Sequence, residues 1–188
     1  MQTQVDYDRR YFTMLARYNR ITNEKLFTLL ASFESGSKES EFAKERGAYF
    51  GSLRGIANHV LACDVHWMRR FREIFGYFGP LAHARLQPDG HVWTKFEIET
   101  LQELTRERKV VDALLEEFTA TADTSRFDEI LRYRDSAGTE LHFIFRDALS
   151  HVFNHQTHHR GQMSQILDEI GLEHDISDLL DSLAPAAR

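Results

Sequence analysis

The chain has 188 residues, of which 42% are hydrophobic, and its formal net charge is −6. This acidic balance argues against a general nucleic-acid binder and against attachment to an anionic membrane, because both partners attract basic surfaces. No apolar run approaches the ~18 residues that a spanning helix needs, and the first residues lack the apolar core of a signal peptide. The single cysteine, Cys63, cannot form an intrachain disulfide, so we expect one soluble, cytoplasmic domain over residues 1–188.

Two long amphipathic helices are predicted in the first half of the chain. Apolar residues recur at spacings of three and four from about residue 6 to 32 and again from about 48 to 77, which is typical of helices with one buried face. Between them, residues 32–47 (SFESGSKESEFAKERG) form a polar stretch that predicts a connection. The second helix is expected to end in the segment GYFGP, at Gly79 and Pro80.

A third helix is predicted to end near residue 120. Before it, residues 80–92 lack a helical pattern, and Pro88-Asp89-Gly90 predicts a turn. Thr94 is the candidate N-cap, because Glu97 stands three positions later and completes a capping-box pattern.

The last part of the chain predicts a hairpin and a fourth long helix. In residues 131–143, the segment DSAG lies between two short alternating stretches, as in a small β-hairpin. The helix then covers about 144–170, with Gly171 as its C′ residue, and a short tail helix is expected around 176–183. Four such segments predict an all-α fold, a four-helix bundle with a small β-hairpin before the last long helix.

Four of the ten histidines lie close together in residues 151–162, HVFNHQTHHRGQ. Histidine is the commonest metal ligand, although such a run can also be a solvated helix face. With about 100° per residue and His155 at zero, the apolar side of this helix points near +70°, and His159 lies at about +40°. His151 and His158 fall at about −40° and −60°, further from the apolar side. The pair His155 and His159 is therefore the favoured inward pair, and the pair His151 and His155 remains open.

Other polar residues of the two histidine-bearing helices take different places by the same count. Gln162 shares the face of the pair and is a candidate for orienting a ligand or water, whereas Arg160 points away and is expected to have a surface or partner-facing role. On the second helix, His59 falls on the flank of the apolar arc and Asp64 near its centre, where a carboxylate needs a partner. Cys63 is interpreted as a small, half-buried helix residue.

Three separated stretches resemble the DinB/YfiT-like family of metalloenzymes. The segment NHQTHHRGQMSQIL looks like its C-terminal signature, N-H-x-x-x-H-R-G-Q followed by an apolar run. The segment LRGIANHVLACDVHWMRRF is similar to its second helix, in which an acid follows a histidine five positions later. The segment ARYNRITNEKLFTLLAS is similar to its first helix, where Y-N-x-x-x-N is common.

The resemblance implies a four-helix bundle with up-down-down-up connectivity and a divalent metal bound by three histidines. Carried over by position, the metal ligands are His59, His155 and His159. Asp64 matches the family's acidic position and is expected in a supporting role next to a ligand, and His158 stands where the pattern is variable. His151, His158, Gln162 and Asp64 are thus the candidates for residues around the ligands or on the substrate side.

The resemblance also implies a function. Family members include thiol S-transferases that use low-molecular-weight thiols, and metal-dependent isomerases. We therefore expect a metal-dependent transferase or hydrolase for a small molecule, with Zn, Ni or Fe as the ion and a metal-bound water as the reacting group, since no protein nucleophile is assigned. The alternative is a non-catalytic, metal-binding or stress-related bundle protein. A homodimer is also implied, and the run HWMRRFREIFGYF is compatible with either an interface or core packing.

Overall fold

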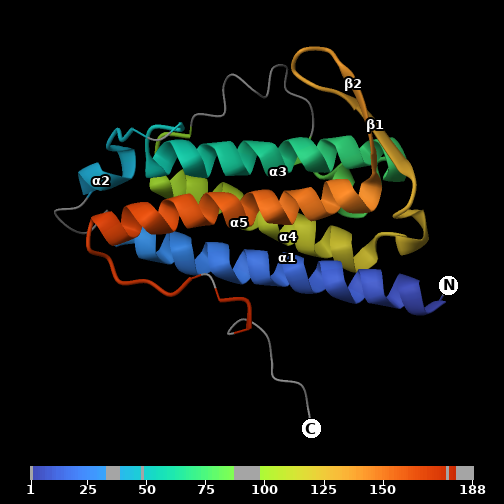
Figure 1. Ribbon diagram of the computed structural model, residues 1–188, viewed down its shortest axis with the longest axis horizontal. Helices are drawn as coiled ribbons and strands as arrows, with labels where there is room; N and C mark the ends of the chain where they lie inside the picture. Colours follow the sequence, from blue (N-terminus) through green and yellow to red (C-terminus); the bar gives the residue numbers. More distant parts are fainter. Residues whose placement is uncertain (1, 33–38, 48, 87–97, 177, 181–188) are drawn as a thin grey trace, which may run out of the picture.

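The protein is described from a computed structural model, which covers residues 2–32, 39–47, 49–86, 98–176 and 178–180. It is mostly helical, with one small two-stranded hairpin, as the sequence predicted. Figure 1 shows four long helices lying side by side. They are α1 (Gln2–Ala31), α3 (Leu53–Phe75), α4 (Leu101–Thr121) and α5 (Phe145–Glu169). The short elements are α2 (Glu39–Ala43) and the 3-10 turns η1 (Gly79–Ala82), η2 (Ala84–Leu86) and η3 (Thr124–Arg126).

Helix α3 is shorter at both ends than its apolar pattern predicted. The side chain of Ser52 accepts a hydrogen bond from the backbone N–H of Gly55 and so caps the first turn, as serine commonly does. At the other end, Gly76 has a φ of 67° and stops the helix before GYFGP. The polar connection that precedes α3 also contains the short helix α2, which the sequence did not predict.

Helix α4 begins later than expected. Thr100, and not Thr94, is its N-cap, since its hydroxyl accepts a hydrogen bond from the backbone N–H of Glu103. This pair has the same spacing as the predicted cap six residues earlier, so the sequence holds two candidate caps in succession. Thr94, Glu97 and the predicted turn at Pro88-Asp89-Gly90 lie outside the described residues.

The hairpin stands between α4 and α5, where the sequence predicted it. Strands β1 (Ile130–Arg134) and β2 (Glu140–Ile144) pair antiparallel, with Leu131 opposite Phe143. The carboxylate of Asp135 accepts hydrogen bonds from the backbone N–H groups of Ala137 and Thr139, which closes the turn. Helix α5 then follows β2 directly, so the hairpin positions the start of the histidine-bearing helix.

Helix α5 ends as predicted, with Gly171 at C′. Gly171 has a φ of 71°, and the backbone N–H groups of Gly171 and Leu172 donate to the carbonyls of Asp168 and Leu167. This pattern is a Schellman motif, which favours glycine because of its positive φ. Most of the predicted tail helix lies outside the described residues, and the part from 178 to 180 contains no α-helix.

The core is sorted along the helices into an aromatic end and a more polar end. Near the hairpin, buried phenylalanines pack edge-to-face or stacked on one another (Phe71, Phe118, Phe127, Phe145). His59 lies on α3 about 18 Å from Phe71 by helical rise. The α3 helix packs against both α4 and α5, and so does α1. The polar residues discussed below are therefore placed on neighbouring helices away from the aromatic end.

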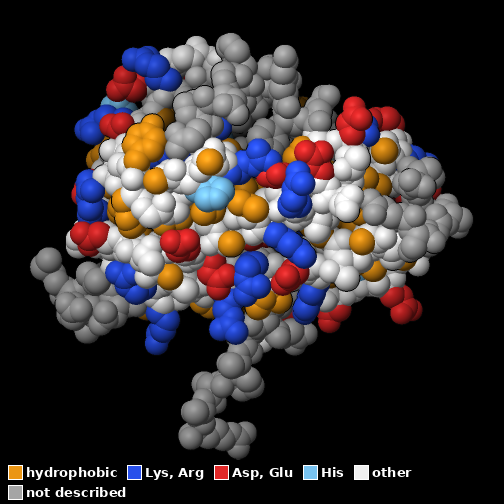
Figure 2. All heavy atoms as spheres, turned by 180° about the vertical axis from the view of Figure 1, so that it is seen from behind, with side chains coloured by type: hydrophobic (Ala, Val, Ile, Leu, Met, Phe, Trp, Pro, Cys, Tyr) orange, Lys and Arg blue, Asp and Glu red, His pale blue; other side chains and the backbone are white. Residues whose placement is uncertain are grey.

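The described surface is mixed in charge where Figure 2 shows it. On that face, seen from behind relative to Figure 1, acidic and basic side chains are interspersed with apolar ones. A search of the described residues finds no helix that combines the length and the apolar character needed to cross a bilayer.

Candidate metal site

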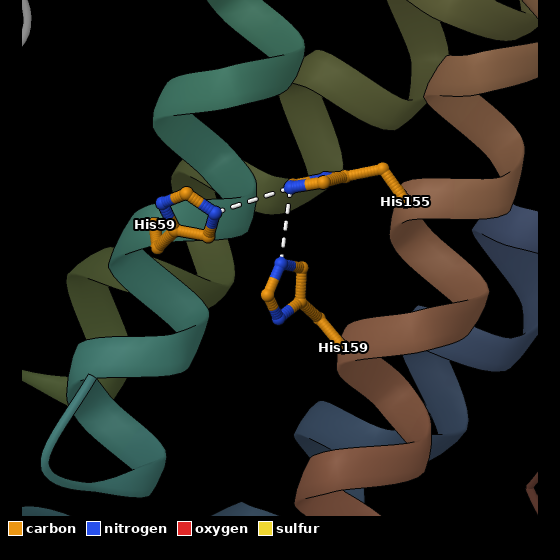
Figure 3. Close-up of side chains that lie close together, drawn as sticks. All are labelled: His59, His155 and His159. Atoms are coloured by element: carbon orange, nitrogen blue, oxygen red, sulfur yellow. Dashed lines mark hydrogen bonds between the residues drawn. The ribbon is translucent and has the colours of Figure 1, made fainter. Parts of the chain in front are cut away.

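Three histidines from two helices bring their ring nitrogens together between α3 and α5. His59 projects from α3, and His155 and His159 project from successive turns of α5 (Figure 3). The Nε2 atom of His155 lies 3.1 Å from Nε2 of His59 and 3.0 Å from Nε2 of His159. One ligand atom from each ring lies within 4.8 Å of the others. These three residues are called the histidine cluster below.

Hydrogen bonds within the histidine cluster cannot satisfy all of these contacts. A neutral imidazole nitrogen carries either one proton or one lone pair. Nε2 of His155 can therefore donate to one neighbour or accept from one, but it meets two. The second short N···N contact is then left without a full hydrogen bond of its own. A cation at the meeting point of three lone pairs removes this conflict.

The spacing of the nitrogens also fits a transition metal. Zinc binds histidine nitrogen at about 2.0–2.1 Å in tetrahedral sites, which places two such nitrogens ~3.3 Å apart. The two Nε2 distances of 3.1 and 3.0 Å are close to that value. The group could thus hold a metal ion, and three protein ligands would leave a fourth position for water or substrate.

Burial keeps the histidine cluster in the neutral form that binds metal. It lowers the pKa of His59 to about 4 and that of His155 to about 3, and the neighbouring histidines lower both further. The pKa of His159 is also lowered, mainly by burial, although its hydrogen bond to Gln162 opposes the change. At neutral pH all three rings therefore present an unprotonated nitrogen, as metal ligation requires.

The three rings differ in what holds their second nitrogen. Nδ1 of His159 lies 2.8 Å from Oε1 of Gln162, which can accept its proton and so leave Nε2 free for an ion. The ring of His59 is contacted by Sγ of Cys63 at 3.7 Å. Nδ1 of His155 is buried and has no hydrogen-bond partner among the described residues. Gln162 is thus the candidate supporting residue that the structure brings next to a ligand.

An aromatic ring covers one side of the histidine cluster. Phe50 stacks on His59 with ring centroids 3.8 Å apart, and it meets His159 edge-on at 5.4 Å. The loop that carries Phe50 comes so close to α3 that a Cβ atom on Gly55 would lie 1.9 Å from the carbonyl oxygen of Phe50. Glycine at position 55 is therefore needed for this approach. Phe50 was not predicted from the sequence, which marks it only as an aromatic residue shortly before the Ser52 cap.

The other two histidines of α5 flank the histidine cluster and are exposed. The ring of His151 lies 5.8 Å from that of His155 and 5.3 Å from Trp67. The ring of His158 lies 4.8 Å from that of His159, and its Nε2 contacts the amide of Gln162. The pair that comes together with His59 is thus His155 and His159, and His151 borders the site on one side.

Asp64 lies apart from the histidine cluster. It is 1% exposed, and its Oδ2 accepts hydrogen bonds from Arg108 on α4, at 2.5 Å, and from Gln156 on α5. Among the described residues no contact joins it to a histidine. The expectation that its place in the apolar arc demands a partner is confirmed, but the partner is an arginine and not a ligand imidazole. Burial raises the pKa of Asp64 to about 6, against the opposing effect of Arg108.

Arg160 is buried, and its predicted place at the surface was wrong. It is 5% exposed, and its guanidinium donates to the side-chain oxygens of Asn19 and Thr157. On the helical wheel Arg160 lies about 140° from His155, and the centre of the apolar arc lies near +70°, midway between them. His155 and Arg160 therefore stand on the two opposite edges of this arc. The face opposite the histidines is thus also inside the protein, against α1.

Seven polar residues from all four long helices form a buried polar network. Its members are Asn19, Asn23, Asp64, Arg108, Asp112, Gln156 and Arg160. The sequence analysis did not predict the α4 members. A signal was present, since Arg108 stands at helical spacing from Leu104, Val111 and Leu115, all of which are buried. His59 is the converse case, because it lies on the flank of its apolar arc and yet faces α5.

Comparisons with known proteins point to one family. The family model described as "DinB family" matches residues 1–187, essentially the whole chain. No curated protein matches the chain, and no solved structure does.

Proposed function

Because the chain belongs to the DinB family, we propose that it is a metal-dependent enzyme that acts on a small molecule through one divalent transition metal ion bound by His59, His155 and His159. The observation that carries this proposal is the contact of one Nε2 atom with two others, at 3.1 and 3.0 Å. Imidazole ligands suit Zn, Ni and Fe, and these three ions are the candidates.

The proposal includes the arrangement of the chain that the family resemblance implies. Residues 1–188 are taken as one domain, a four-helix bundle with up-down-down-up connectivity. It is supported by the contacts of α1 with α4 and α5, and of α3 with the same two helices. In Figure 1, α3 and α4 run in one direction and α1 and α5 in the other. A cytoplasmic homodimer also belongs to the proposal, and its mass in solution tests the dimer.

The proposed reaction is the transfer of a thiol, or the hydrolysis of a small substrate. A bound ion would supply Lewis acidity, which lowers the pKa of a coordinated water or thiol. The chain's own thiol is unsuited to attack, since burial raises the pKa of Cys63 to about 12, so the nucleophile would be a substrate thiol or a water. Gln162 holds the proton on Nδ1 of His159, and Phe50 keeps water from the side on which His59 and His159 meet.

Metal analysis of untagged protein tests the site. We expect about one transition metal ion per chain in the wild type, from the open three-histidine site, and loss of most of it in His155→Ala. His142→Ala is the control, because this exposed histidine lies on β2 of the hairpin and should leave the metal content unchanged. Equal metal content in the wild type and in His155→Ala would contradict the assignment.

Turnover assays then separate the enzyme from the alternative, a non-catalytic metal-binding or stress-related protein. Metal-loaded wild type and His155→Ala are compared on low-molecular-weight thiols with a panel of electrophiles, and on small ester and amide substrates. Activity that depends on His155 and on the metal supports the enzyme. Full metal content without turnover on any substrate of these classes favours the alternative.

A further inference from the structure

A hollow at the end of α3 is lined almost entirely by arginines. It has a volume of about 410 Å³, and its lining residues are Arg69, Arg70, Arg72, Glu73, Tyr77 and Arg132. Five of them belong to the end of α3 and the residues after it, and Arg132 belongs to β1, which packs on α3. Four guanidinium groups and one carboxylate give this arginine hollow a formal charge of +3, in a chain whose net charge is −6.

The arginines of the hollow differ from most others in the described chain. Eight arginines elsewhere form ion pairs with carboxylates (Arg20, Arg46, Arg85, Arg106, Arg108, Arg126, Arg134, Arg146). Among the described residues, no ion pair joins a carboxylate to Arg70, Arg72 or Arg132. Like charges collected in one hollow repel each other unless a counter-charge is present. Glu73 lines the hollow and Asp135 acts on Arg70 without forming an ion pair with it, and a bound anion would supply further counter-charge.

Two of these guanidinium groups, those of Arg70 and Arg72, are held in place by groups that carry no negative charge. Arg70 lies over the rings of Trp67, at 4.6 Å, and Tyr133, at 3.9 Å. Arg72 lies 4.5 Å over Tyr77 and donates two hydrogen bonds to the carbonyl of Leu81. Arg69 donates to the carbonyl of Leu86 at 3.0 Å. Cation–π contacts and carbonyls orient an arginine without neutralising it, so the hollow is organised before any ligand arrives.

We propose that the arginine hollow is a binding site for a small anion with two or more negative charges, of the class of phosphate esters or polycarboxylates. Planar guanidinium forks match the oxygens of either group. The site is separate from the histidine cluster and does not depend on the proposed function. It also explains the run HWMRRFREIFGYF, which folds so that Phe71 and Ile74 face the core while Arg69, Arg70 and Arg72 line the hollow.

Calorimetric titration at low ionic strength tests the site, with inorganic phosphate and succinate as probes in separate arms. We expect the wild type to bind at least one of them, and the stronger binder identifies which anion class the site takes. In Arg132→Gln the affinity should fall about tenfold, the effect of losing one charge-assisted contact. Arg132 is exposed, so this variant should fold normally, and Arg70→Gln should show the same loss.

Two controls make the outcome decisive. Arg134→Gln removes an equal charge from the same strand, but Arg134 is paired with Glu140 and does not line the hollow, so its affinity should stay within about twofold of the wild type. His155→Ala should also bind like the wild type, which separates this site from the metal. Binding of neither probe, or equal affinity in the wild type, Arg132→Gln and Arg70→Gln, would overturn the proposal.

Discussion

Helix α5 contributes to two polar sites, one on each edge of its buried face. The two sites differ in how their buried polar groups are paired. On one edge His155 and His159 face His59 on α3. On the other edge Gln156 and Arg160 enter the buried polar network. In that network two aspartates are matched by two arginines, and most of the polar groups find partners in the chain. In the histidine cluster, by contrast, one ring nitrogen meets two others and can form a full hydrogen bond with only one of them.

The difference separates a site whose charges are matched within the chain from one that offers lone pairs to a ligand. Buried polar groups in a network of matched charges add specificity to a fold but present nothing to a ligand. A cluster of convergent lone pairs is costly until a ligand supplies the positive charge. The buried polar network is thus expected to carry stability and register, and the histidine cluster to carry binding. Experiments that perturb one site and leave the other intact test this separation.

The largest effect is expected from Arg108→Met. This change leaves Asp64 and Asp112 without their shared guanidinium, which lies 2.5 Å from the first and 2.8 Å from the second. Breaking a buried ion pair of this kind should lower the free energy of unfolding by about 3 kcal/mol, measured by urea denaturation. Arg106→Met on the same helix is the control, because this arginine is exposed and its contacts with Glu103 and Glu107 are long, at 3.7 Å each, so they should matter by no more than ~0.5 kcal/mol.

If the two variants unfold at the same urea concentration, the buried polar network does not carry the stability assigned to it. If Arg108→Met also loses its bound metal while still folded, the two sites are coupled and the separation fails.

An intermediate effect is expected from Gln162→Leu, which perturbs the histidine cluster and leaves the buried polar network intact. Gln162 is the residue whose oxygen accepts the proton of His159 Nδ1, at 2.8 Å. Loss of such a partner typically weakens metal affinity about 10–100-fold, measured by competition with a coloured chelator. Gln165→Leu, one turn later on the same helix, is the matched control and should leave the affinity unchanged. Its amide contacts Glu169 at the surface.

The smallest effect is expected when pH is lowered. Because burial lowers the pKa of His59 to about 4 and of His155 to about 3, protons compete with a metal only well below neutral pH. Metal affinity should therefore change less than ~10-fold between about pH 7 and about pH 5.5, whereas three histidines of ordinary pKa would lose ~1000-fold. A chelator competition series over this range decides between them, and a thousandfold loss would contradict the burial described here.

The helical pattern was enough to predict α5, its end at Gly171 and the inward pair of histidines. These features depend on local sequence, since helical spacing and a glycine with positive φ act within one or two turns. The start of α4 was missed because Thr94 and Thr100 carry equivalent capping signals, and local sequence does not rank them.

Features that depend on two helices at once were harder to predict. The apolar arc of α3 places His59 on a flank, but it does not say that α5 lies against that flank. In the same way Arg160 was assigned to the surface because the arc has two edges, and only packing against α1 shows that both are buried. His59 was predicted as a ligand only from the family resemblance, because the pattern of one helix does not show which helix lies beside it.

Gly55 determines the position of Phe50 over the histidine cluster, although Gly55 itself is not a ligand. The chain crosses there so tightly that any side chain would push the backbone of Phe50 away, and the ring of Phe50 rests on His59. The position of the ring that covers His59 is thus governed by main-chain geometry in the first turn of α3. One methyl group at position 55 would displace the backbone of Phe50 and so change how its ring covers the histidine cluster.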